Sequence, residues 1–245
     1  TPLQNQAWLA LLNIHERSRD WAAAGEVARQ LSQGGEAGFE VRRSHYLCEQ
    51  AAALPPQAQA QRLALLTQAC EIAPHSVRPR LALADEYQAQ GNHVTALQQR
   101  LALAQAMPRF VPLLAAGLAQ LALDQNRAPE ILELLQQHAQ ESPSLDVMEA
   151  LATLDKAMGQ ADVQSRYARH LQTEPSLVAA RSWLASEPLA HEVVRPALER
   201  ALDRAVQPLR RYRCAACGFE AQRHFWQCPG CQAWDSYPPR RVEEL

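Results

Sequence analysis

The chain has 245 residues and a mass of 27.3 kDa, with 47% hydrophobic and 20% charged residues, so it can form a sizeable core and is too mixed to be disordered. Its net charge of -2 and pI near 6.4 exclude a global positive field that would attract nucleic acid or an anionic membrane. No apolar run approaches the roughly 18 residues that a membrane-spanning helix needs. We expect a soluble chain and, because it begins Thr1-Pro2 without Met, a fragment or processed form.

A helical period dominates the chain from residue 5 to about residue 175, where apolar residues recur at spacings of three and four. Four prolines punctuate this region at intervals of 34, 35 and 32 residues: Pro74, Pro108, Pro143 and Pro175. These intervals are close to the 34-residue period of tetratricopeptide repeats, in which each unit is a pair of helices. The alternative is a generic helical bundle whose prolines fall regularly by chance.

Residues 80–108 show the internal pattern of one unit. Leu83-Ala84 and Tyr87 form the packing face of a first helix, Gly91-Asn92 form the turn, and Ala96 is the small residue where the second helix crosses closely. Residues 8–31 fit the same frame and residues 147–171 fit it less well, while residues 43–74 and 111–143 keep only the apolar spacing and the closing turn. Stacked units of this kind curve around a groove that can bind peptides or proteins. We therefore predict an all-α tetratricopeptide-repeat superhelix over residues 1–207, with two more helices after Pro175.

The same frame predicts which side chains line the groove. The second, fifth, ninth, twelfth and thirteenth residues of each first helix should point into it. The partner-binding residues predicted in this way are Asn13, Glu16, Arg17, Arg78, Asp85, Gln88, Asp155 and Lys156. The alternative is a solvated face that binds no partner.

The sequence carries no recognisable catalytic motif. It lacks G-x-x-x-x-G-K-[ST], G-x-G-x-x-G and G-x-S-x-G, and the segment His191–Arg195 lacks the second histidine of a zinc-protease helix. Cys48 and Cys70 lie alone in helical patterns, where thiols usually behave as small buried hydrophobes. We therefore predict that the chain is not an enzyme.

The C-terminal residues 208–245 contain two closely spaced Cys-x-x-Cys pairs, which indicate a separate metal-binding module in a protein from a reducing compartment. Each pair can direct two thiolates at one centre, so the predicted metal ligands are Cys214, Cys217, Cys228 and Cys231. So short a module cannot bury enough apolar surface to fold alone, and metal binding must supply much of its folding free energy. The alternative is two reduced or disulfide-bonded pairs without metal.

Aromatic and basic residues surround these cysteines. We expect some of Phe219, Phe225, Trp226 and Trp234 to dock the module onto the last helices, because four exposed aromatics would form a sticky patch. Stacking on nucleic-acid bases is the alternative. Acidic residues among the flanking arginines disfavour that alternative, and no nucleic-acid partner is expected.

The tail "YRCAACGFEAQRHFWQCPGCQAW", following a degenerate repeat array, resembles the C-terminus of the lipopolysaccharide assembly protein B family, whose tail is rubredoxin-like. The positions that carry this resemblance are Tyr212, Cys214, Cys217-Gly218-Phe219, Trp226, Cys228-Pro229, Cys231 and Ala233-Trp234. One departure is Gln232, where electron-carrying rubredoxins place Gly. It puts iron in doubt, and we expect one metal ion, with zinc favoured over iron.

The resemblance implies a non-enzymatic adaptor on the cytoplasmic face of the Gram-negative inner membrane, held there by an N-terminal membrane anchor that this chain lacks. The implied partners are a membrane-bound AAA zinc protease, the UDP-acyl-N-acetylglucosamine deacetylase whose degradation limits lipid A synthesis, and other lipopolysaccharide assembly proteins. Direct binding of lipopolysaccharide is left open. A rubredoxin-type electron carrier and a zinc-ribbon nucleic-acid-binding protein are the alternative functions.

Overall fold

The computed structural model describes residues 2–35, 38–159, 163–185 and 187–245. Within these residues there are twelve α-helices, three 3-10 helices and one two-stranded sheet, which confirms the predicted all-α fold with a small C-terminal four-cysteine module. The chain divides into two compact units, residues 1–105 and 106–245. The predicted boundary between residues 207 and 208 stays a prediction.

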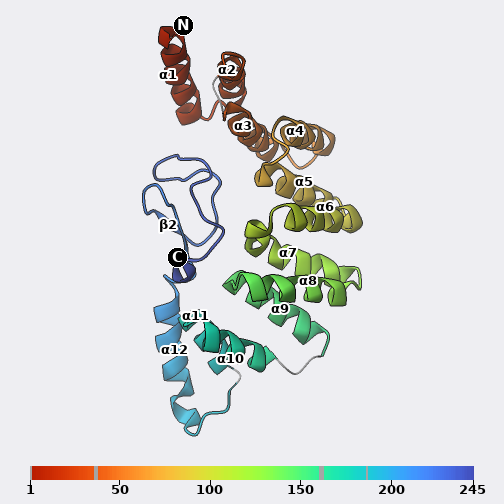
Figure 1. The fold of residues 1–245 in the computed structure, drawn as a ribbon, viewed down its shortest axis with the longest axis vertical. Coiled ribbons are helices and arrows are strands. Elements are labelled where there is room, and N and C mark those ends of the chain that lie inside the picture. The colour runs from red at the N-terminus through yellow and green to blue at the C-terminus, as the bar shows by residue number, and fades with distance from the viewer. Residues whose placement is uncertain (1, 36–37, 160–162, 186) are drawn as a thin grey trace. The chain divides into compact units, whose positions relative to one another are not determined.

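The first unit is a succession of short helices joined by tight turns (Figure 1). Its elements are α1 (Pro2–Ser18), α2 (Trp21–Gln33), α3 (Phe39–Ala53), α4 (Gln59–Ile72), α5 (Val77–Ala89) and α6 (His93–Ala106). From α1 to α5 each helix packs on the next, and α3 also packs on α5. The Asp20 side chain caps α2 by accepting a hydrogen bond from the Ala23 amide at 3.1 Å.

Polar side chains connect neighbouring helices inside this unit. The Arg62 guanidinium of α4 donates two hydrogen bonds, at 2.8 and 2.9 Å, to the carboxylate of Glu86 in α5. Both side chains are largely buried, and hydrogen bonding to Arg62 lowers the pKa of Glu86. Such bidentate pairs fix the register of one helix against the next.

The second unit continues the helix pairs (Figure 1). Its helical elements are η1 (Pro108–Phe110), α7 (Val111–Asp124), α8 (Ala128–Glu141), α9 (Leu145–Ala157), α10 (Val163–Thr173), α11 (Leu177–Leu184), η2 (Glu192–Val194) and α12 (Arg195–Val206). The α7 helix packs on α8 and α9, and its buried leucines and alanines form the centre of this unit.

The spacing of the first helices confirms the predicted repeat. Helices α5, α7, α9 and α11 begin at Val77, Val111, Leu145 and Leu177, at intervals of 34, 34 and 32 residues. Each of the four punctuating prolines lies between one helix pair and the next. The proline therefore ends one unit at the point where the next first helix must begin.

The C-terminal module is a small sheet with two cysteine turns, and it belongs to the second unit. Strands β1 (Tyr212–Arg213) and β2 (Glu220–Ala221) pair antiparallel, and η3 (Val242–Glu244) ends the chain. A cluster of Tyr212, Cys214, Cys228 and Tyr237 forms its core, with Phe225 and Leu113 of α7 packed against it.

The module packs on other elements of the second unit, but its aromatic contacts differ from the expected docking onto the last helices. The Trp226 ring lies 6.5 Å from that of Phe110 in η1, and Leu113 of α7 packs against the module core, so the contacts begin well before the last helices. Phe219 is 44% exposed and Trp234 is half-buried. The helical period of the sequence predicts the helix pairs, but it does not show that the C-terminal module folds back across three of them.

Among the described residues no single helix is long and apolar enough to cross a membrane, although His93–Ala106 and Pro108–Asp124 satisfy such a test when taken together. The isolated cysteines behave as predicted, because Cys48 lies in a core cluster against which Cys70 packs. Burial raises the pKa of the Cys48 thiol to about 12 and that of Cys70 above its usual value. Both thiols are therefore poor nucleophiles at neutral pH.

Candidate metal centre

The two Cys-x-x-Cys turns have the same backbone hydrogen bonds. In the first turn, the Gly218 amide donates to the Cys214 carbonyl at 2.9 Å, and the Cys214 amide donates to the Phe219 carbonyl at 2.9 Å. In the second turn, the equivalent bonds run from Gln232 to Cys228 at 2.8 Å and from Cys228 to Ala233 at 2.9 Å. Each turn therefore presents its two sulfurs in the same way.

The four cysteine sulfurs converge on one point. They all lie within 4.8 Å of one another, with 3.8 Å between the sulfurs of Cys214 and Cys231 and 3.6 Å between those of Cys217 and Cys228. Four sulfurs at about 2.3 Å from a tetrahedral ion would lie about 3.8 Å apart. The donor set and its spacing thus fit one metal ion, and a thiolate tetrahedron suits zinc or iron.

The surroundings favour the thiolate form of the two buried ligands. Burial opposes ionisation of Cys214, but hydrogen bonds from Ser236 and from the Cys217 and Ala216 amides lower the pKa of its thiol to about 6. Cys228 is also buried, and amide hydrogen bonds from Cys231 and Gly230 lower the pKa of its thiol. Metal binding requires deprotonated sulfur, so these contacts prepare the site for a cation.

The departure at Gln232 does not change the backbone turn. Gly218 has a φ of 79°, and Gln232, at the equivalent place in the second turn, has a φ of 62°. A side chain at this left-handed position is unfavourable, whereas glycine adopts it freely. Since the two turns match, the substitution by itself does not distinguish zinc from iron.

We expect Gln232→Gly to stabilise the metal module by about 1 kcal/mol, because it removes a left-handed side-chain-bearing residue from an exposed turn. Thermal unfolding of the metal-loaded protein would measure this gain. The matched variant Gly218→Ala should lose a similar amount, since a Cβ there meets no atom within 4 Å and only the backbone conformation is affected. A Gln232→Gly variant no more stable than the parent would contradict this view of the turn.

Aromatic side chains pack together beside the cysteine turns. His224 donates a hydrogen bond through Nε2 to the Tyr237 carbonyl at 3.0 Å, and its ring meets those of Tyr212 and Trp226 edge to face. The Tyr237 hydroxyl donates to the Phe219 carbonyl at 3.1 Å. Burial lowers the pKa of His224, so this histidine acts as a neutral packing residue.

The module is attached to α9 by an ion pair that the sequence analysis did not find. The Arg241 guanidinium donates to both carboxylate oxygens of Asp146, at 3.0 Å from Nε and 2.5 Å from Nη2. The Tyr212 hydroxyl lies 3.2 Å from the same carboxylate, and Arg241 stacks over the Tyr212 ring at 4.4 Å. No local pattern links residues this far apart in the chain, so only the folded structure brings them together.

Three of the eight predicted groove residues are buried and have partners within the protein. Glu16 accepts a hydrogen bond from the Tyr46 hydroxyl at 2.5 Å, and Arg78 donates to Glu49 at 2.5 Å. Asp155 is 1% exposed and accepts a hydrogen bond from Arg166 of α10 at 2.7 Å. These side chains join neighbouring helices within the protein.

The other five predicted residues are more accessible. Asn13, Arg17 and Lys156 are exposed, whereas Asp85 pairs with the buried Arg100 and the Gln88 side chain accepts a hydrogen bond from Arg100 at 3.3 Å. A separate open groove of about 470 Å³ lies in the second unit, lined by residues of α8, α9 and α10, with Met148 and Leu151 among them. Partner binding at any of these positions stays a prediction.

Comparison with known proteins supports the resemblance seen in the tail. Residues 212–239 match a family described as the rubredoxin metal binding domain. The chain is 25% identical over 239 residues to lipopolysaccharide assembly protein B of Escherichia coli K12, covering 94% of this chain and 61% of that protein. It is 22% identical over 240 residues to the Haemophilus influenzae protein of the same name, covering 96% of this chain and 61% of that one.

The predicted resemblance to these proteins is thereby confirmed, and the chain spans 61% of the length of the curated relatives it matches. Among solved structures, a tetratricopeptide repeat protein from Parabacteroides merdae is similar with a TM-score of 0.49 and 12% identity, covering 82% of this chain and 78% of that one.

Proposed function

We propose that this chain is the repeat and metal-binding part of a non-enzymatic adaptor in lipopolysaccharide assembly. The observation that supports this most strongly is similarity over 94% of the chain to proteins named lipopolysaccharide assembly protein B, together with the match of residues 212–239 to the rubredoxin metal binding domain family. Stacked helix pairs present extended surfaces suited to holding another protein. The metal module has the geometry of a structural site, with all four ligands supplied by the chain.

In this proposal the complete protein is held at the cytoplasmic face of the inner membrane. There it brings the UDP-acyl-N-acetylglucosamine deacetylase to a membrane-bound AAA zinc protease for degradation. Both partners follow from the family resemblance. The chain's own contribution is a docking surface, and the exposed cationic residues predicted for it are Arg17 in the first unit and Lys156 in the second, which are separate candidates. Arg78 is buried and pairs with Glu49, so it is left out of the test below.

Charge reversal tests each candidate by itself in the complete protein. Arg17→Glu and Lys156→Glu are each expected to lengthen the deacetylase half-life in cells about twofold or more, because one lost charged contact weakens docking by roughly 0.5–1 kcal/mol. Reversal of two exposed arginines of α12, Arg200→Glu/Arg204→Glu, is the control and should leave the half-life unchanged. An unchanged half-life in either single variant would remove that residue from the proposal.

A separate comparison tests the function itself. If cells without the complete protein degrade the deacetylase at the normal rate, the adaptor proposal is wrong whatever surface is used.

The identity of the bound metal decides between the adaptor and the electron-carrier alternative. A red, iron-loaded protein with a reversible potential would favour electron transfer, and a colourless zinc protein would favour a structural role.

A further inference from the structure

The same Pro-Ser-Leu triplet stands at the start of two first helices of the second unit, with Pro and Ser just before the helix and Leu as its first residue. Pro143-Ser144-Leu145 opens α9, and Pro175-Ser176-Leu177 opens α11, 32 residues later. In both places the serine is buried and its hydroxyl accepts a hydrogen bond from an amide of the first turn, at 3.5 Å from Val147 and 2.9 Å from Ala179. One serine cannot satisfy all four free amides of a helix N-terminus.

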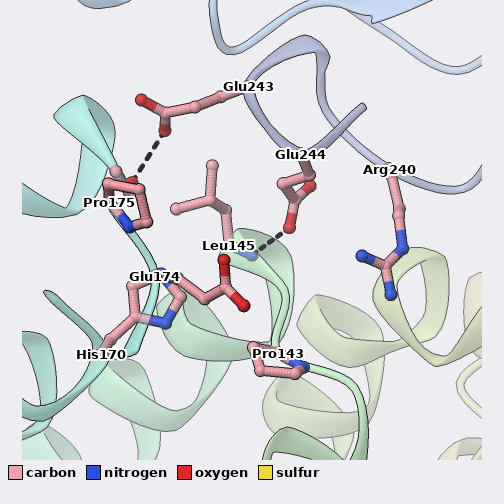
Figure 2. Close-up of a pocket in the computed structure, with 9 residues that line it drawn as sticks. Pro143, Leu145, His170, Glu174, Pro175, Arg240, Glu243 and Glu244 are labelled. Carbon is pink, nitrogen blue, oxygen red and sulfur yellow. Dashed lines mark hydrogen bonds between the residues drawn. The ribbon is translucent and has the colours of Figure 1, made fainter. Parts of the chain in front are cut away.

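The last residues of the chain supply the missing acceptors. The Glu243 carboxylate accepts hydrogen bonds from the Leu177 amide at 2.5 Å, the Val178 amide at 3.3 Å and the Ser176 hydroxyl at 2.8 Å. The Glu244 carboxylate accepts one from the Leu145 amide at 2.7 Å. Figure 2 shows the two side chains leaving the C-terminal turn in different directions, one toward Pro175 and one toward Leu145. Consecutive residues thus cap the N-termini of two different helices.

The position of these glutamates depends on the metal module. The Val242 amide donates to the Arg211 carbonyl at 2.7 Å, and the Glu243 amide donates to the Leu209 carbonyl at 3.3 Å. Arg241 is held by Asp146 and by the Tyr212 ring. Tyr212 precedes the metal ligand Cys214 by two residues and shares its core cluster. The segment that positions the glutamates is therefore built on the first cysteine turn.

Burying a carboxylate costs free energy, and the hydrogen bonds that the docked C-terminal turn makes offset that cost. Burial raises the pKa of Glu244, whereas hydrogen bonds from the Arg241 and Leu145 amides favour its charged form. Negative charge is also favoured beside the first turn of a helix. If the tail moved away, the amides would lose an acceptor and the helix ends would be left with serine alone.

We propose that Glu243 and Glu244 form a metal-dependent latch, in which an ordered cysteine module holds the C-terminal turn in place and so caps α9 and α11 of the repeat array. Loss of the metal releases the turn and loosens the starts of both helices. The coupling is reciprocal, so the closed latch also strengthens metal binding. This goes beyond the adaptor function and does not require that any particular partner be correct.

Hydrogen exchange on zinc-loaded, reduced protein tests the latch. Removing zinc with a chelator is expected to speed exchange of the Leu145, Leu177 and Val178 amides roughly five- to tenfold, the factor that corresponds to losing a helix cap. Amides in the middle of α8 should not change. If the three amides exchange equally fast with and without zinc, the latch does not exist.

A double variant separates the latch from general loosening of the module. In Glu243→Ala/Glu244→Ala the three amides should exchange fast even with zinc bound, and chelation should add less than a twofold change. Chelator competition should also show weaker zinc binding, by up to the same five- to tenfold factor. The control Glu71→Ala/Glu133→Ala removes two exposed carboxylates and should behave as wild type. A double variant that responds to chelation as strongly as wild type would show that another contact carries the coupling.

Discussion

Cys228→Ser is expected to unfold the C-terminal module and to abolish stoichiometric metal binding. The Cys228 sulfur is fully buried at the centre of the module core, and serine oxygen is a poor replacement for a thiolate ligand. Metal binding contributes roughly 10 kcal/mol or more to the folding of small thiolate sites, so loss of one ligand should cost about 5 kcal/mol or more. Elemental analysis of freshly purified reduced protein, together with thermal unfolding, would measure both effects.

The helical signal in circular dichroism should stay largely intact, because the described α-helices all lie before the module and most of their core lies away from it. Cys70→Ser is the matched control, since this half-buried thiol lies outside the cysteine cluster. It should keep one metal ion per chain and unfold near the parent temperature. A Cys228→Ser protein that retains one tightly bound metal ion would contradict the assignment of the ligands.

The cysteine module and the repeat period were predictable because each rests on local spacing. Pro108 and Pro143 recur close to the repeat length, and two residues between paired cysteines suffice to direct both sulfurs at one point. Such patterns can be recognised in a sequence because the interacting residues lie close together in the chain. The Pro-Ser-Leu triplets before α9 and α11 are a signal of the same kind, and they mark the two capped helix ends.

Whether the predicted groove residues are buried or exposed was not predictable from spacing alone. The period places Arg78 on one face of its helix, but whether that face is open depends on Glu49, which lies 29 residues earlier in α3. Likewise, Arg241 pairs with Asp146, which lies 95 residues earlier in the chain, and the local sequence around either residue does not indicate this pairing. Period determines the direction of a side chain, whereas its burial is decided by residues from other helix pairs.

Substitution of Asp155 tests most sharply whether the buried groove residues hold neighbouring helices together. The residue is 1% exposed, and its carboxylate faces the guanidinium of Arg166, which is itself 15% exposed and has a nitrogen 2.7 Å away. Removing one partner of a buried ion pair leaves an uncompensated charge and typically costs about 3–5 kcal/mol. Asp155→Ala is therefore expected to lower the free energy of unfolding by about 3 kcal/mol, with the loss concentrated where α10 packs on α9.

The neighbouring Lys156 provides the control, because it is exposed and was assigned to the same predicted groove. Lys156→Ala should change the unfolding free energy by no more than about 0.5 kcal/mol, as is usual for exposed positions. Denaturant unfolding of both variants, read with hydrogen exchange across Leu145–Ala157, would separate the two roles. If Asp155→Ala is as stable as Lys156→Ala, the pair with Arg166 does not hold these helices together, and Asp155 becomes available again as a partner-binding residue.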